Sequence, residues 1–140
     1  MSKGLTIALI VAGCLLVTCF GGGYLIYRNF VAPGGAAYTE GASFAATTDN
    51  NGCLGEARSR VKADPGMANA VVQGVFLMSC LEKSAAAPGF CDSIPAMRGD
   101  SARASQWIEE RCPGINKSPD PGCLMIEMQV QNFCHPTKRG

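Results

Sequence analysis

Cysteine is the residue type with the most evident chemistry in this 140-residue chain, which contains eight of them. Six follow residue 50, namely Cys53, Cys80, Cys91, Cys112, Cys123 and Cys134. An even number of cysteines in a short exported domain is typical of a disulfide framework. Thiol–disulfide catalysis usually employs the Cys-x-x-Cys spacing, and no two cysteines here are closer than five positions. We therefore expect structural bridges.

Few other residues are suited to catalysis or to metal binding. His135 is the only histidine and no carboxylate cluster accompanies it, so neither a metal site nor a histidine-activated nucleophile is predicted. The adjacent carboxylates of Glu109 and Glu110 would point about 100° apart on a helix, into water. The sequence indicates no catalytic residue, no metal and no cofactor, and thus a protein that is not an enzyme.

The charge balance excludes one further class of partner. The chain has 12 Lys and Arg against 11 Asp and Glu, and setting aside Lys3 and Arg28 leaves 10 against 11. Proteins that bind nucleic acid usually present a basic patch or stripe. We expect no nucleic-acid partner.

One apolar segment near the N-terminus is long enough to cross a membrane. Leu5 to Tyr27 is a run of 23 residues without a charge, and a helix of roughly 20 apolar residues spans the hydrocarbon core. Tyr24 and Tyr27 lie near its C-terminal end and Arg28 follows it, as aromatic and basic side chains do at the headgroup level. The flanking charges are too few to orient the helix, but six paired cysteines require an oxidising compartment. We expect a cytoplasmic N-terminus and a periplasmic or extracellular C-terminal domain.

Two other fates of this segment remain open. Val11-Ala12-Gly13-Cys14 resembles the lipobox of bacterial lipoproteins, in which the cysteine is acylated and becomes the new N-terminus. The residues before Cys14 would also serve as the short apolar core of a cleaved signal peptide. The apolar stretch continues well beyond Cys14, which favours a retained anchor.

Small residues recur along the predicted membrane helix. Ala8 and Ala12, and then Thr18 and Gly22, have small-xxx-small spacing, which allows a second helix to approach closely. Small residues are also common in membrane helices without such contacts. We expect this face to pack against partner helices.

The rest of the chain divides by composition into three parts. Residues 30–52 are rich in Gly, Ala, Ser and Thr without a sustained apolar period, and predict a flexible linker. Residues 53–135 carry helical periodicity, and 136–140 form a short tail, while 1–29 contain the anchor. The predicted fold is all-α, with a disulfide-stapled bundle of about four helices in two hairpins, 53–87 and 101–134.

Local signals place the four helices. Leu54, Ala57 and Val61 mark the first, which Asn50 or Asn51 could cap. The second and fourth each begin at Asp-Pro-Gly, at residues 64 and 120, with the aspartate as N-cap and proline at the first helical position. The third starts at residue 100 or 101 and ends before Pro113-Gly114, with Trp107 expected in the core. The second is apolar nearly all round and is expected to be central.

Hairpin geometry ranks the fifteen ways of pairing six cysteines. A turn near Pro65 brings residue 77 opposite Cys53, about one helical turn from Cys80. Cys112 and Cys123 flank the second turn symmetrically, which leaves Cys91 for Cys134. Sequence favours this scheme without proving it.

Without a catalytic constellation, an interaction role fits the sequence best. We expect a non-catalytic accessory or structural subunit of a membrane protein complex, whose helix docks on other subunits and whose domain packs on the outer face. The alternative is a membrane-tethered or lipid-anchored extracytoplasmic module that binds a protein or a small ligand.

Overall fold

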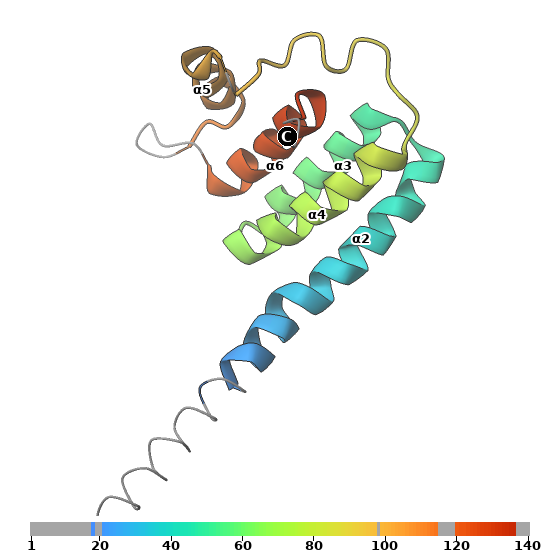
Figure 1. Ribbon diagram of the computed structural model, residues 1–140, viewed down its shortest axis with the longest axis vertical. Helices are drawn as coiled ribbons and strands as arrows, with labels where there is room; N and C mark the ends of the chain where they lie inside the picture. The colour runs from blue at the N-terminus through green and yellow to red at the C-terminus, as the bar shows by residue number, and fades with distance from the viewer. Residues whose placement is uncertain (1–17, 19–20, 98, 115–119, 137–140) are drawn as a thin grey trace, which may run out of the picture. The chain divides into compact units, whose positions relative to one another are not determined.

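Most of the chain that the structure describes is helical. The computed structural model describes residues 18, 21–97, 99–114 and 120–136, and the chain divides into two units, 1–33 and 34–140. Within these residues the only β-structure is one isolated bridge, between Asp49 and Ala85. In chain order the elements that follow the helical residues 21–26 are η1 (Tyr27–Val31), α2 (Ala32–Phe44), η2 (Ala45–Thr47), α3 (Asn50–Ala63), α4 (Met67–Lys83), α5 (Ser101–Arg111) and α6 (Pro121–Cys134) (Figure 1).

The described part of the first unit contains a π-helical turn, η1, between α-helical residues. Proline lacks an N–H and its ring clashes with the carbonyl four residues earlier, which for Pro33 is that of Asn29. A π turn widens the helix by one residue and relieves such a clash. The N–H of Ala32 accordingly bonds to the carbonyl of Tyr27 rather than to that of Arg28.

The predicted flexible linker is wrong, because residues 32–44 form α2 and its part in the second unit packs on α4. A Cβ added to Gly41 would lie 2.3 Å from the Phe76 carbonyl oxygen, and Ser79 Oγ donates to the Tyr38 carbonyl at 2.7 Å. The same small residues that suggest a tether permit this close approach of two helices. Residue types alone do not distinguish the two outcomes, because the apolar surface that orders α2 belongs to α4.

An ion pair adds to the contact between α2 and the rest of the second unit. Arg60 Nη2 lies 2.7 Å from Glu40 Oε1, and its Nε lies 2.8 Å from Glu56 Oε1. The hydrogen bond from Arg60 lowers the pKa of Glu40. The guanidinium carbon also stands 4.2 Å from the centre of the Phe76 ring. Arg60 thus joins α2, α3 and α4.

Helices α3 and α4 form the first predicted hairpin, held at its open end by Asn50. The side chain of Asn50 is buried, donates to Ser84 Oγ at 3.0 Å and accepts from the Ala87 N–H at 3.1 Å. Asp49 rather than Asn50 or Asn51 caps α3, by accepting from the Gly52 N–H at 2.9 Å. The predicted cap is wrong because the burial of Asn50 directs its side chain to the end of α4.

The two Asp-Pro-Gly sequences have different roles. Asp120 caps α6 with Pro121 at the first helical position, as predicted, and Asp100 caps α5. Asp64 instead ends α3, and α4 begins only at Met67 after Gly66, without a side-chain cap. The short turn between α3 and α4 consumes the residues that would otherwise start the helix, so the predicted cap at Asp64 is wrong.

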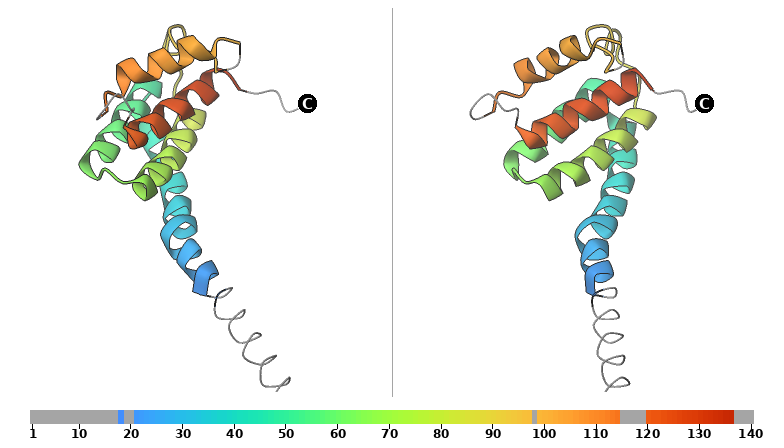
Figure 2. Two further views of the ribbon diagram at one scale, coloured as in Figure 1. Left: turned by 90° about the vertical axis from the view of Figure 1, so that its left-hand side faces the viewer. Right: turned by 60° about the vertical axis from the view of Figure 1, so that its left-hand side comes forward.

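Helix α6 lies between α5 and the α3–α4 hairpin in both views of Figure 2. The side chains of Ile126 and Val130 on α6 are fully buried, as are those of Phe76 and Leu77 on the central α4. Gly122 allows the start of α6 to approach α3, because an added Cβ would stand 2.6 Å from Val61 Cγ1. Helix α5 covers the other side of α6 with residues that include Trp107, which is 8% exposed.

Three disulfides join these helices, and the pairs are those that hairpin geometry favours. Cys53–Cys80 closes the α3–α4 hairpin, Cys112–Cys123 joins the end of α5 to the start of α6, and Cys91–Cys134 ties the segment between α4 and α5 to the end of α6. Phe90 packs edge-on against Phe133 beside that third bridge. The cross-links indicate that this domain belongs in an oxidising, extracytoplasmic compartment.

The contact between α2 and α4 can be tested with two glycines of the same helix. Gly41→Ala should lower the free energy of unfolding by about 1–3 kcal/mol, because the new methyl group has no room against the α4 backbone. Gly35→Ala should raise it by up to about 1 kcal/mol, because the site is open and alanine favours helix. Denaturant unfolding of the oxidised chain, followed by circular dichroism, measures both. Equal effects of the two substitutions would contradict the packing of α2.

Candidate functional site

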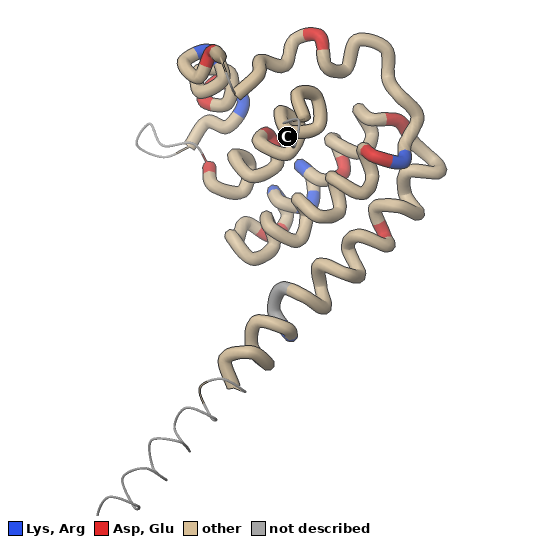
Figure 3. The backbone as a smooth tube through the Cα atoms, in the orientation of Figure 1, with Lys and Arg blue, Asp and Glu red and all other residues tan. Residues whose placement is uncertain are grey.

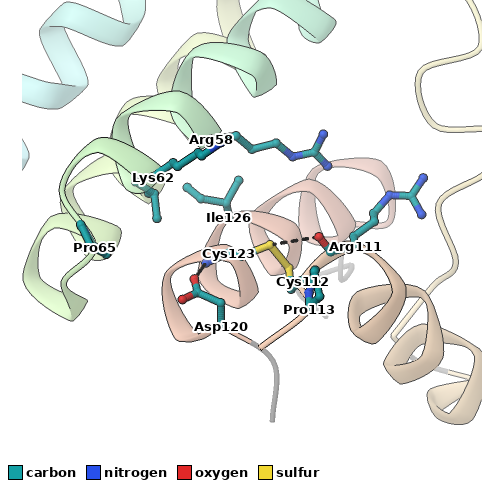
Figure 4. A pocket seen from close by; sticks show the side chains of 10 residues that line it. Arg58, Lys62, Pro65, Arg111, Cys112, Pro113, Asp120, Cys123 and Ile126 are labelled. Atoms are coloured by element: carbon teal, nitrogen blue, oxygen red, sulfur yellow. Dashed lines mark hydrogen bonds between the residues drawn. A yellow bond between two sulfur atoms is a disulfide. The ribbon is translucent and has the colours of Figure 1, made fainter. Parts of the chain in front are cut away.

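A cleft of about 500 Å³ opens where the turn after α3 faces the junction of α5 and α6. Three cations, one aspartate and the Cys112–Cys123 bridge lie among its lining residues (Figure 4). The residues that line it are Arg58, Val61, Lys62, Pro65, Arg111, Cys112, Pro113, Asp120, Cys123 and Ile126.

The cations reach the cleft from two helices. Arg58 and Lys62 lie one turn apart on α3, where Figure 3 shows a concentration of basic residues, and Arg111 is the last residue of α5. The guanidinium carbon of Arg111 stands 4.3 Å from the centre of the Trp107 ring, a cation–π contact that holds the side chain in place. In Figure 4 the guanidinium groups of Arg58 and Arg111 extend toward the same side of the cleft.

Arg58 is held by a buried carboxylate. Its Nε donates to Glu127 Oε1 at 2.7 Å, and its Nη2 bonds to the same oxygen. The Glu127 side chain is 0% exposed whereas that of Arg58 is 43% exposed. A carboxylate without water needs such a donor, because an uncompensated buried charge is strongly destabilising.

Buried polar atoms without a partner among the described residues gather on α5 and α6. They are Glu127 Oε2, Trp107 Nε1 and both amide atoms of the Gln131 side chain, together with Gln73 Oε1 on α4. Buried polar groups are normally hydrogen-bonded, so exceptions mark places where a protein interior departs from simple packing. The α6 face that carries Glu127 and Gln131 is therefore polar as well as buried.

The disulfide of the cleft lies against this polar face. The Sγ atoms of Cys112 and Cys123 and a carboxylate oxygen of Glu127 all lie within 4.8 Å of one another. Two thiolates and a carboxylate at such distances could bind a metal ion, but sulfurs joined in a bridge carry no thiolate. In its oxidised form this cluster is thus not a metal site.

The predicted helix-packing face lies mostly outside the described residues, which exclude Ala8, Ala12 and Cys14. Thr18 and Gly22 are helical, and a Cβ added to Gly22 would meet no described atom within 4 Å. Only Thr18 and residues 21–27 of the predicted membrane segment are described. No helix within the described ranges is both long enough and apolar enough to cross a membrane.

The other residues considered as candidate site residues in the sequence lie outside the cleft. His135 ends α6, and its Nε2 lies 2.6 Å from the Ile94 carbonyl oxygen. Glu109 and Glu110 are exposed, as predicted. Neither His135 nor these glutamates line the cleft.

The sequence analysis missed Arg58, Lys62, Arg111 and Glu127. One signal for Glu127 was present, since Cys123, Glu127 and Gln131 recur every four residues and therefore share one face of α6. A glutamate beside the apolar Ile126 and Val130 is an exception to the apolar pattern. The cations carried no comparable signal, because basic residues on helices usually point into water.

The pairing of Arg58 with Glu127 generates a stability prediction. Arg58→Met should destabilise the domain by about 3 kcal/mol, because it leaves the buried Glu127 carboxylate without its partner. This value is at the lower end of the range for a broken buried ion pair, because Arg58 is partly exposed and water can replace part of the lost hydrogen bonding. Arg58→Met combined with Glu127→Leu should recover most of that loss. Arg103→Met, at an exposed cation of α5, serves as the control and should change stability by less than about 0.5 kcal/mol. A double variant no more stable than Arg58→Met alone would contradict the pairing.

Known proteins offer no guide to this site. The chain matches no protein-family model, no curated protein and no solved structure.

Proposed function

We propose that the chain is a non-catalytic accessory subunit of a membrane protein complex. One transmembrane helix near the N-terminus anchors it, and the disulfide-stabilised helical domain packs on the outer face of the complex. The observation that carries the proposal is the exposure of four consecutive apolar residues, Tyr24 to Tyr27, whose exposed fractions are 57–61%.

Four consecutive helical residues point in directions about 100° apart. The apolar side chains therefore surround the helix instead of forming one stripe. An amphipathic helix of a soluble domain has an apolar stripe and a polar face, whereas a helix that is apolar all round is buried by lipid or by other helices. Val31, also exposed at 55%, extends the apolar surface by one more turn. Tyr24 to Tyr27 form the end of the uncharged run that begins at Leu5.

The domain beyond residue 33 supports an anchor that places it outside the cytoplasm. Its three bridges would be reduced in a cytosolic environment. A helix that crosses the membrane once and is followed by such a domain has its N-terminus on the cytoplasmic side. The small residues Ala8, Ala12, Thr18 and Gly22 would then lie at the depth of the hydrocarbon region, where close packing of helices depends on such residues.

A tethered binding module is the second candidate, and the cleft favours it. Arg58, Lys62 and Arg111 line a cavity in which Asp120 is the only acidic residue among the described lining residues. Such a cavity suits an anionic group on a protein or a small molecule. In this case the cleft, and not the membrane helix, would be the surface that binds the partner.

Replacement of the small residues distinguishes the two candidates. The full chain, extracted in mild detergent, should copurify with partner subunits at a fixed stoichiometry. Mass spectrometry of the purified sample identifies these partners. The variant Ala8→Leu, Ala12→Leu, Thr18→Leu and Gly22→Leu should remain in the membrane fraction and lose them, because the leucines prevent close approach. Replacing Ile7, Ile10, Val11 and Val17 by leucine is the matched control and should retain them.

Two results would contradict the accessory-subunit role. Recovery of the chain in the soluble fraction would exclude the anchor. Partners that survive the small-residue replacements but are lost in Lys62→Gln or Arg111→Gln would instead support the binding module.

A further inference from the structure

We propose that Cys112–Cys123 is an exchangeable disulfide that reacts with thiols of another protein, whereas the other two bridges are structural. The inference goes beyond an anchoring or subunit role. It rests first on access: both cysteines line the cleft, but Cys123 is only partly buried whereas Cys112 is 1% exposed. One sulfur is thus open to attack and the other is sheltered as the leaving group. Both cysteines of Cys53–Cys80 are fully buried.

The electrostatic surroundings of Cys123 favour a negatively charged sulfur. Cys123 is the third residue of α6, and its N–H donates to Asp120 Oδ1 at 2.8 Å. Arg58, Lys62 and Arg111 line the same cleft. Helix N-termini and neighbouring cations both stabilise a thiolate, the form that attacks or leaves in exchange. The opposing charges are the carboxylates of Asp120 and Glu127.

Glu127 supplies a proton acceptor beside the sheltered sulfur. Its side chain is 0% exposed, Oε2 has no partner in the described part of the chain, and a carboxylate oxygen lies within 4.8 Å of both sulfurs. When the bridge is reduced, Cys112 becomes a thiol away from bulk water. A buried base at this distance can take its proton and generate the thiolate that reforms the bridge.

The exchange balances in electrons and atoms. A thiolate of a partner dithiol attacks Cys123 Sγ, the bond to Cys112 breaks, and Cys112 leaves as a thiolate that takes up one proton. The second partner thiolate attacks the mixed disulfide and releases the Cys123 thiolate. The partner dithiol is oxidised to a disulfide and this bridge is reduced to two cysteines, a transfer of two electrons. In the reverse direction Glu127 accepts the proton of Cys112 before Cys112 attacks the mixed disulfide at Cys123.

The fold tolerates opening of this bridge better than of the others. Cys112 and Cys123 are separated by 11 residues, against 27 for Cys53–Cys80 and 43 for Cys91–Cys134. The constraint that a bridge places on the unfolded chain grows with loop length. When the Cys112–Cys123 bridge opens, Cys53–Cys80 still joins α3 to α4, and Cys91–Cys134 still joins the segment after α4 to the end of α6.

Cys91–Cys134 provides an internal control, because both of its cysteines are also partly exposed. Its sulfurs lie outside the basic cleft and are absent from the described cluster with Glu127. Accessibility alone would make the two bridges react alike. A difference between them would therefore report on the charges and the buried carboxylate.

The experiment incubates the full-length protein with mixtures of reduced and oxidised glutathione, then alkylates free thiols and quantifies each bridge by peptide mass spectrometry. Cys112–Cys123 should open at least about 10-fold faster than Cys91–Cys134, with unchanged circular dichroism. In a Cys112→Ser variant, oxidised glutathione should form a stable mixed disulfide at Cys123. Equal or faster opening of Cys91–Cys134, or failure of Cys123 to form the mixed disulfide, would overturn the proposal.

Two further variants test the roles of the neighbours. Glu127→Gln should slow reoxidation of the reduced Cys112–Cys123 pair by about 10-fold or more and leave that of Cys91–Cys134 unchanged. Because Glu127→Gln could also weaken the domain, Arg111→Gln supplies a second test and should slow attack by the reduced Cys123. Arg103→Gln, on the same helix but outside the cleft, should have no effect. Identical rates in Arg111→Gln and Arg103→Gln would show that the cleft charge plays no part.

Discussion

Three covalent cross-links hold the helical unit together because the apolar core between its helices is small. Of the fifteen buried residues in the core cluster, three are alanines (Ala37, Ala45, Ala57) and three are cysteines (Cys53, Cys80, Cys112). Alanine buries little surface, and a domain of this size gains only marginal stability from its core. The bridges compensate by restricting the unfolded chain. Each is placed where two elements meet, so the cysteines also determine which helices are neighbours.

The small residues that limit the core also allow the helices to lie close together. Gly41 brings α2 onto the backbone of α4, and Gly122 brings the start of α6 onto Val61. Close packing of this kind leaves little freedom for the polar side chains that share the interface. Glu127 is one of them, and its burial requires the bonds from Arg58. The resulting arrangement places a charged pair beside the Cys112–Cys123 bridge, so the packing of α3 on α6 also creates the cleft.

The chain therefore offers two surfaces with different chemistry. Residues Tyr24 to Tyr27 expose apolar side chains on all sides of a helix, which suits lipid or partner helices. The cleft of the helical unit combines cations with a partly exposed cysteine and lies beside the buried carboxylate of Glu127, an arrangement that suits anions and thiols. An anchored accessory subunit needs only the first surface. Exchange at Cys123 would add to it a way of responding to, or changing, the thiols of a neighbouring protein.

The sequence by itself determined the helical class and the four predicted helices, and it favoured, without proving, the cysteine pairs that the structure contains. These depend on local periodicity, on turns and on the distance along the chain, which are all present in the order of residues. The predicted N-caps at Asn50 or Asn51 and at Asp64 were wrong, because the burial of Asn50 and the shortness of the turn after α3 override local capping preferences. The tether between residues 30 and 52 was wrong for a related reason: small residues form either a flexible chain or a tightly packed helix, and only the surface of α4 decides between them. The cleft was also beyond the sequence, since Arg58 and Glu127 are 69 residues apart and their meeting depends on how α3 packs against α6.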